Sequence, residues 1–213
     1  MKENHFIYRY FKEGMNPFKS ISDFSDEEIA PFMEKYFPKH RWFHADPEGR
    51  IKTRRNIENW LHSNFISSGG KPKTNHPCYF TLEKSSFLQE FESFEGQSKE
   101  IKIPLCLFSC DNISFTYPDS FFSEWLSRNK DHDLYDEELN GKIFKLKELL
   151  SLLDSGRIPN NIYMDTLNYK YHLYIEAQVW DYSILTNFQK SNKQLHLTQK
   201  IVGQKTANTL LCK

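Results

Sequence analysis

HLYIEAQVW, residues 172–180, alternates as a β-strand does and ends the strongest strand candidate of the chain, Tyr171–Trp180. The alternation assigns Leu173, Ile175, Ala177 and Val179 to one face and Tyr174, Glu176, Gln178 and Trp180 to the other. Glu176 therefore lies in mid-strand between aromatic side chains. A buried carboxylate without a partner costs free energy, but one that lines a cleft is suited to act as a general base or a hydrogen-bond acceptor. The alternative is a half-exposed strand with Glu176 on its solvated outer face.

The elements that precede this strand mix β-strands with helices. Strands are predicted at Phe6–Tyr10, Cys78–Leu82, Ile101–Phe108 and Ile113–Tyr117. Helices are predicted from Ser25 to just before Pro38, from Asp46 to near Gly69, near Ser85–Phe91, at Ser120–Arg128 and at Lys147–Asp154. Because strands and helices do not alternate strictly, the pattern favours an α+β domain. We expect one domain over residues 1–188 and a polar, loosely held segment over residues 189–213.

Two of the predicted helices have clear N-terminal signals. Ser25 and Glu28 have the spacing of a capping box. Asp46 followed by Pro47 has the form of an N-cap and a first helical residue. These starts depend on neighbouring residues alone, so we expect them to be preserved in the folded chain.

The charge balance excludes a global attraction to polyanions. The 213 residues include 28 Lys and Arg and 28 Asp and Glu, which gives a net charge of +0 and a pI near 7.1. The longest apolar run, Ile103–Phe108, is far shorter than the roughly 20 residues of a membrane span, and Lys2–His5 do not open a signal peptide. We expect a cytoplasmic protein without membrane contact, and export as an effector stays open.

The cysteines and histidines do not form the patterns of disulfide or metal sites. Cys78, Cys106, Cys110 and Cys212 match neither a CxxC pair nor a secreted disulfide scaffold, so we expect reduced thiols, with Cys106 and Cys110 in or beside a strand. His40 and His44 are four residues apart but lack the glutamate of a zincin motif. The acidic run Asp131–Glu138 lacks the glycine and the ligand spacing of a calcium loop. GxSxG, Walker A and GxGxxG motifs are also absent, and we expect no metal.

Two groups of arginines require partners. Arg9 lies in a strand candidate rich in aromatics and needs a carboxylate, a phosphate or an aromatic face, unless the strand is an edge strand with Arg9 exposed. Arg54 and Arg55 follow Ile51 by three and four residues, so one of them can flank the buried stripe of the helix and point into a cleft. The alternative is that the cluster Arg50–Arg55 is a solvated face.

Taken in order, these segments resemble the ADP-ribosyltransferase superfamily, and most closely the DarT-type toxins, which transfer ADP-ribose from NAD to DNA. Over residues 6 to 188, Ile7–Tyr10 resembles the first-strand motif, Ile113–Tyr117 a further strand of the split sheet, and Tyr174–Val179 the late strand with the catalytic glutamate. The Arg54–Arg55 helix, Pro77–Phe80 and Ser85–Leu88 resemble the arginine-bearing segment, the Tyr-Phe strand and the short helix after it. The resemblance implies a split antiparallel or mixed β-sheet with flanking helices. Arg9 stands where the toxins have His, which leaves the acceptor open.

The resemblance also implies roles for individual residues. Glu176 would be the catalytic carboxylate, which hydrogen-bonds the nicotinamide ribose and stabilises the positive charge that forms as nicotinamide leaves. Arg9, with Tyr8 beside it, would anchor NAD through the ribose or the pyrophosphate. Arg55 or Arg54 would bind a phosphate or the acceptor.

Two further residues complete the implied NAD site. Tyr79 would stack on nicotinamide, and Ser86 would contact NAD from the short helix. The alternatives are that Tyr79 is a core aromatic and that Ser86 merely caps the helix. The acceptor would be a macromolecule, either nucleic acid or protein.

Two other functions remain compatible with the sequence. A catalytically silent interaction domain would have Arg9 and Glu176 paired with each other or with core partners, and no open pocket. A nucleic-acid-binding module would use Arg50–Arg55 together with Lys71 and Lys73, interleaved with the aromatic residues Trp60, Tyr79 and Phe80.

Overall fold

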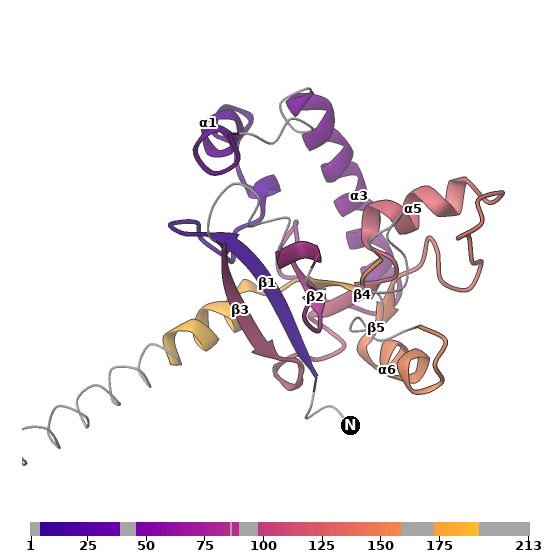
Figure 1. Ribbon diagram of the computed structural model, residues 1–213. Helices are drawn as coiled ribbons and strands as arrows, with labels where there is room; N and C mark the ends of the chain where they lie inside the picture. The colour runs from indigo at the N-terminus through magenta and orange to yellow at the C-terminus, as the bar shows by residue number, and fades with distance from the viewer. Residues whose placement is uncertain (1–4, 39–45, 86, 90–97, 159–172, 192–213) are drawn as a thin grey trace, which may run out of the picture.

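The computed structural model of the chain describes residues 5–38, 46–85, 87–89, 98–158 and 173–191. Within them, six strands form one sheet in the order β3-β1-β2-β6-β4-β5, and all neighbouring strands are antiparallel (Figure 1). The strands are β1 Phe6–Lys12, β2 Cys78–Leu82, β3 Ser98–Pro104, β4 Ile113–Thr116, β5 Phe144–Lys145 and β6 Glu176–Val179. The predicted α+β class, with an antiparallel sheet and flanking helices, is confirmed.

The longer helices agree with the capping signals of the sequence. They are α1 Asp26–Tyr36, α3 Pro47–Ser67, α5 Ser120–Arg128 and α6 Leu146–Asp154, and residues 182–191 are also helical. Ser25 and Glu28 form the predicted capping box of α1, and Asp46 caps α3 by accepting a hydrogen bond from the Gly49 amide at 3.0 Å. None of the helices in the described part of the chain has both the length and the apolar character that a membrane span requires.

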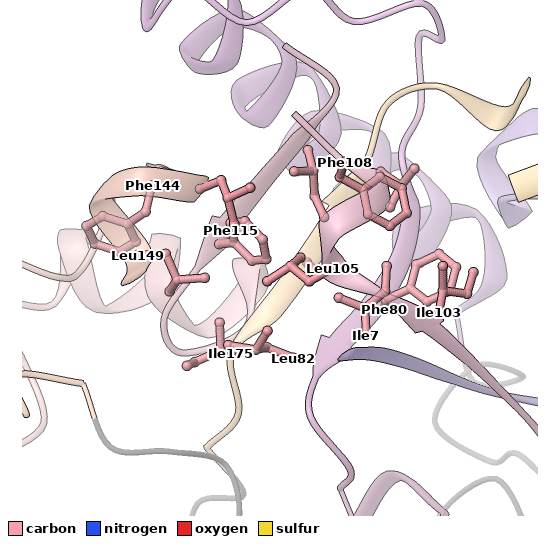
Figure 2. Close-up of a cluster of buried hydrophobic side chains, with 14 of the residues drawn as sticks. Ile7, Phe80, Leu82, Ile103, Leu105, Phe108, Phe115, Phe144, Leu149 and Ile175 are labelled. Atoms are coloured by element: carbon pink, nitrogen blue, oxygen red, sulfur yellow. The ribbon is translucent and has the colours of Figure 1, made fainter. Parts of the chain in front are cut away.

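One face of the sheet carries the main hydrophobic core. Ile7 of β1, Phe80 and Leu82 of β2 and Phe115 of β4 pack there, as Figure 2 shows. The apolar stripe of α6 and Leu185 of the helical residues 182–191 cover this face. The core thus joins the sheet to the elements nearest the C-terminal end of the described chain.

The other face of the sheet packs against α3. Leu61 and Phe65 of this helix are fully buried with Trp180, whose ring stacks on Phe65 at a centroid distance of 5.7 Å. α5 lies against α3. In the view of Figure 1, α1 and α3 are above the strands and α6 is below them. β6 is therefore buried on both faces.

The interpretation that Glu176 lies on a solvated outer face is wrong. Glu176 is 8% exposed, and Gln178 and Trp180 on the same face are 0% exposed. The polar side chains there bond to one another: Gln178 Nε2 donates to Thr116 Oγ1 at 3.0 Å, and Trp180 Nε1 donates to Ser114 Oγ at 2.9 Å. The physical reason is that β6 pairs with β2 and β4 on its two sides while α3 covers the face that the alternation marks as polar.

Several predicted elements have different ends in the structure. The last strand begins at Glu176 instead of Tyr171, and residues 171–172 are outside the described part. The predicted strand Ile101–Phe108 ends at Pro104, because a 3-10 turn, η3 Leu105–Leu107, follows the proline and leaves Cys106 exposed. Helical residues continue from 189 to 191, beyond the expected end of the domain at 188, and residues 192–213 are outside the described part.

Candidate functional site

A cavity of about 700 Å³ opens between the polar face of the sheet and the helices above it. Its apolar and aromatic wall is made by Tyr10, Met15, Ile21, Phe32, Met33, Phe37, Ile51, Phe121 and Tyr174. Its polar groups belong to Arg9, Lys19, Arg50, Thr53, Arg54, Asp119 and Glu176. A concave, mainly apolar wall with a few convergent polar groups is typical of sites that bind small molecules, and the volume is in their range.

Glu176 is held at this cavity by the start of α5. Its Oε2 accepts hydrogen bonds from the Ser120 amide at 2.8 Å and from Gln178 Nε2 at 3.3 Å. Burial and the neighbouring charge of Asp119 raise the pKa of Glu176 to about 7, although Ser120 and Arg54 act in the opposite direction. The carboxyl can therefore change its charge near neutral pH, as catalytic carboxyl groups often do.

Asp119 is a second carboxylate on the wall of the same cavity. It is the N-cap residue of α5, and its Oδ1 accepts a hydrogen bond from the Phe122 amide at 3.2 Å. Burial raises the pKa of Asp119, although hydrogen bonds from backbone amides at the helix start oppose the rise. Sequence reasoning missed this residue. An aspartate directly before the predicted helix Ser120–Arg128 was a recognisable N-cap, but nothing local showed that it faces a cavity.

Arg54 is the arginine of α3 that lines the cavity with Glu176. Its Nε lies 3.2 Å from Glu58 Oε1, and its guanidinium lies over the Tyr79 ring at 4.5 Å from the centroid. Burial disfavours its charge, but Tyr79 and the carboxylates of Glu58 and Glu176 outweigh that effect, so the pKa of Arg54 is raised. Arg54 is thus a permanently charged group in a fixed position.

Glu58, which is not part of the described cavity wall, holds Arg54 in place through an ion pair. This residue was not singled out in the sequence. It is 0% exposed, accepts a hydrogen bond from the Tyr79 hydroxyl at 3.1 Å, and lies 2.8 Å from His76 Nδ1. Burial would raise the pKa of Glu58, but His76 and Arg54 outweigh it and the pKa is lowered. The hydrogen bond to Glu58 raises the pKa of His76. A signal was present, because position 58 falls on the same helical stripe as the apolar residues of α3.

Arg55 points away from the cavity. Its Nη1 donates to Asp26 Oδ1 at 2.7 Å and its Nη2 to the Phe24 carbonyl at 3.1 Å, so it joins α3 to the start of α1. The sequence left open which of the two adjacent arginines enters a cleft. The structure places Arg54 on the cavity wall, whereas Arg55 links α3 to the start of α1.

Arg9 lines the cavity, and its strand is not at the edge of the sheet. β1 lies between β3 and β2, so the edge-strand interpretation is wrong. β1 pairs with β2 only through Ile7 and Tyr8, and the Arg9 guanidinium donates to the Tyr79 and Lys19 carbonyls at 3.4 and 3.3 Å and also to Cys78 Sγ. Arg9 and Glu176 are paired with core partners, as the interaction-domain alternative expects, but they share an open cavity, which that alternative does not expect.

The remaining predicted site residues lie elsewhere. Tyr8 is 8% exposed, and the described cavity wall includes neither Tyr8 nor Tyr79. Tyr79 packs beside the cluster around Phe65, and it contacts the site through its ring, its hydroxyl and its carbonyl, which meet Arg54, Glu58 and Arg9. Ser86 is outside the described residues.

Four of the basic residues that suggested a nucleic-acid-binding module, Arg54, Arg55, Lys71 and Lys73, are paired with acids. Lys71 Nζ lies 2.8 Å from Asp111 and Lys73 Nζ 2.8 Å from Asp181. Phe80 is 3% exposed and belongs to the core, so it offers no ring for base stacking. The expected alternation of free cations and exposed aromatics is therefore not what these positions form.

The polar groups of the cavity are arranged by charge and by element. Its two carboxylates come from the start of α5 and from β6, and its cations come from β1, the following loop and α3. In the described residues no group of three or more His, Cys, Asp or Glu side chains is placed to hold a metal ion.

No protein-family model, curated protein or solved structure matches the chain. The chemistry of the cavity therefore has to indicate the function.

Proposed function

We propose that the chain is an NAD-dependent ADP-ribosyltransferase, that its sheet is of the ADP-ribosyltransferase type, and that the cavity between α1, α3 and the sheet is its active site. NAD is the substrate, nicotinamide is released, and ADP-ribose passes to a nucleic-acid or protein acceptor. The observation that carries the proposal is a buried carboxylate, Glu176, in a cavity that it shares with Arg54 and three further cations.

The charges of NAD fit this set of groups. NAD carries two phosphate charges in its centre and one positive charge on the nicotinamide ring. Arg54, Arg50 and Lys19 supply cations for the phosphates, and the guanidinium of Arg54 can bind a phosphate through two donors. Asp119 and Glu176 supply negative charge for the nicotinamide end. The aromatic wall offers rings against which the base and the nicotinamide can pack.

The position of Glu176 supports the proposed chemistry. When the bond between nicotinamide and ribose breaks, the electron pair leaves with nicotinamide, which becomes neutral, and positive charge develops on the ribose. A fixed carboxylate beside the ribose stabilises that charge, and Glu176 is fixed through the Ser120 amide. With a pKa of about 7, Glu176 is only partly ionised near neutral pH. The positive charge of a bound nicotinamide ring would favour the ionised form, which is the form that the reaction uses.

The arginine roles follow from position. Arg54 takes the phosphate-binding role that the sequence assigned to either Arg54 or Arg55. Arg9, at the point where β1 and β2 separate, would bind the ribose or the pyrophosphate from the same cavity. Tyr79 acts on the site by fixing Arg54 and does not stack on nicotinamide in this arrangement.

The test compares NAD binding and nicotinamide release by the wild-type protein and three variants, with circular dichroism as the control for folding. Glu176→Gln should bind NAD but lose about 100-fold or more in release, as for the loss of one transition-state contact. Arg54→Gln should weaken NAD binding by about 10-fold or more, since a charge-assisted hydrogen bond contributes about 1.5–3 kcal/mol. Arg55→Gln, on the adjacent residue, should leave NAD affinity unchanged.

The outcome that removes the proposal is also clear. A folded wild-type protein that neither binds NAD nor releases nicotinamide, with a cell lysate present as a source of acceptors, would leave the interaction domain as the better assignment. Release that is unchanged in Glu176→Gln would show that the chemistry occurs at another site.

A further inference from the structure

The proposed reaction gives the half-buried Asp119 on the cavity wall no part in a proton transfer. Asp119 lies on the cavity wall with Glu176, and its neighbour in the chain, Ser120, donates its amide to Glu176 Oε2 at 2.8 Å. A single peptide link therefore separates Asp119 from the amide that holds Glu176, and the charge of Asp119 acts on Glu176. Capping α5 explains why the residue is an aspartate but not why it faces the cavity. Asp46, the N-cap of α3, does the same task in an exposed position.

We propose that Asp119 is the general base that takes the proton from the acceptor, and that the acceptor is therefore a neutral nucleophile with an O–H or N–H group. This inference rests on the proposed function. The bond between the nicotinamide nitrogen and the ribose breaks with its electron pair on nicotinamide. The acceptor oxygen or nitrogen then forms the new bond to the ribose carbon, and its proton passes to the Asp119 carboxylate and on to solvent.

The two carboxylates are suited to different tasks. Glu176 Oε2 accepts from both Ser120 and Gln178, so the carboxylate is held in place beside the developing ribose charge. Asp119 lies at the start of α5 on the cavity wall, where its carboxylate can face an incoming group while amides of the helix start, including that of Phe122, donate to it. A base with these properties contributes about 10²–10⁴-fold to a proton-transfer step.

The charged groups around Asp119 bear on its protonation. Those that share its cavity are Arg9 and Tyr10 of β1, Lys19 of the following loop, Arg50 and Arg54 of α3, and Tyr174 and Glu176. The negative charge of Asp119 raises the pKa of Glu176, so the empty site holds fewer than two negative charges near neutral pH. Binding of the nicotinamide cation favours ionisation of both carboxyl groups, which prepares the base at the moment when it is needed.

Asp119→Asn is the informative variant, because asparagine caps a helix as well as aspartate does and has no carboxylate. Asp46→Asn is the matched control, since it makes the same change at the N-cap of α3, outside the described cavity wall. The probes are water and methanol, which carry a proton, and azide, an anion that needs no base. Nicotinamide release and the identity of the ADP-ribosyl product are measured for each nucleophile.

We expect Asp119→Asn to lose about 10²-fold or more with water and methanol and to regain release with azide as the ADP-ribosyl azide forms. Asp46→Asn should behave as wild type, and Glu176→Gln should be inactive with all three nucleophiles. Wild-type rates in Asp119→Asn, or a loss that azide does not restore, would overturn the role of Asp119 while the transferase assignment stands. A wild-type protein without any release would overturn the proposed function and this inference with it.

A second readout does not depend on activity. Burial and the charge of Asp119 together raise the pKa of Glu176 to about 7, so Asp119→Asn should lower the pKa of the Glu176 carboxyl, which NMR titration can follow. An unchanged pKa would show that the two groups do not interact and would contradict the pairing of the carboxylates on which the inference depends.

Discussion

The chemistry at the scale of single residues centres on Glu176. A carboxylate that is 8% exposed normally needs a cation beside it, but its direct hydrogen-bond donors here are a backbone amide and a neutral Gln178. Arg54 acts on it through charge. Glu176 is consequently a group whose ionisation is disfavoured by its surroundings, which costs stability and prepares it for a cationic ligand.

This cost predicts how stability depends on pH. The pKa of Glu176 is about 7 in the folded protein against 4.5 for the free side chain, so the folded state binds the proton more tightly. Stability from this group is therefore full below pH 4.5 and is lost as pH rises to about 7. Glu176→Gln should gain stability relative to wild type across that range, by on the order of 3 kcal/mol, as measured by urea unfolding at several pH values.

The control for this measurement is Glu28→Gln. Glu28 is exposed in the capping box of α1, and glutamine completes a capping box as glutamate does. Its difference from wild type should stay constant over the same pH range. A flat difference for Glu176→Gln as well would mean that Glu176 titrates normally and that burial does not hold its proton.

α3 is the element that organises the site. The stripe of the helix that faces the sheet runs from Ile51 through Arg54 and Glu58 to Leu61 and Phe65. Its first half gives charged groups to the cavity, and its second half gives apolar groups to the core. The N-terminal half of α3 therefore places charged side chains at the cavity, and the C-terminal half packs the helix onto the sheet.

The charged half of α3 predicts the effect of Glu58→Gln. Removing the carboxylate leaves the half-buried Arg54 and His76 without their charged partner, which should reduce stability by about 2 kcal/mol. Arg54 should also lose its fixed position, so NAD affinity should fall. Urea unfolding and NAD titration measure the two effects. Glu48→Gln, exposed on the first turn of the same helix, should change both by little.

The Glu58–His76 pair has its own pH range. The pKa of His76 is raised above 6.5, so its contribution to stability is full below pH 6.5 and is lost as pH rises through the folded value. The pKa of Glu58 is lowered below 4.5, so its contribution is present above pH 4.5 and is lost as pH falls through the folded value. Glu58→Gln should therefore be least stable relative to wild type between these limits. An equal difference at all pH values would contradict the ion pair.

The whole molecule has two layers with different tasks. The face that carries Phe115 and Ile175 is a continuous apolar core beneath the sheet (Figure 2). The opposite face is polar at β6, and α1 and α3 enclose a cavity above it instead of filling it. A ligand in the cavity would therefore contact α1, α3, α5 and the sheet at once.

This arrangement predicts that a ligand stabilises the molecule as a whole. ADP-ribose, which keeps both phosphates and cannot release nicotinamide, should add about 2.7 kcal/mol at roughly 100 times its dissociation constant, or about 5–10 °C in Tm. Hydrogen exchange should slow in α1, because Phe32 and Met33 of this helix line the cavity and a bound ligand would hold the helix against α3 and the sheet. A rise in Tm without protection of α1 would show that the ligand binds elsewhere.

Much of the fold could be read locally. The capping residues of α1 and α3, the limits of α5 and the strand Cys78–Leu82 depend on neighbouring residues, and the structure confirms them. The α+β class follows from the order of such elements. The strand ends near Pro104 and Glu176 could not be predicted in this way, because a strand ends where its partner strand or a turn makes it end.

The candidate site was only partly readable. Glu176 and Arg9 stood out because a charge in an aromatic strand needs an explanation, and both line the cavity. The sequence does not show which side of α3 faces the cavity, and adjacent helical residues point about 100° apart. Only the packing of α3 therefore decides that Arg54, and not Arg55, lines the cavity. Asp119 and Glu58 were missed, because nothing in the neighbouring sequence shows which element lies against them.

Short-range forces therefore account for which residues form helices and strands, since caps, turns and alternation act within a few positions of the chain. Burial is different, because a side chain becomes buried only when another element covers it. The packing of α3 and α5 on the polar face of the sheet encloses Glu176 beside Asp119 and brings Arg54, Glu58 and His76 together across separations of up to 22 residues in the chain. Desolvation and the neighbouring charges then shift the pKa values of these groups, and those shifts exist only in the folded molecule.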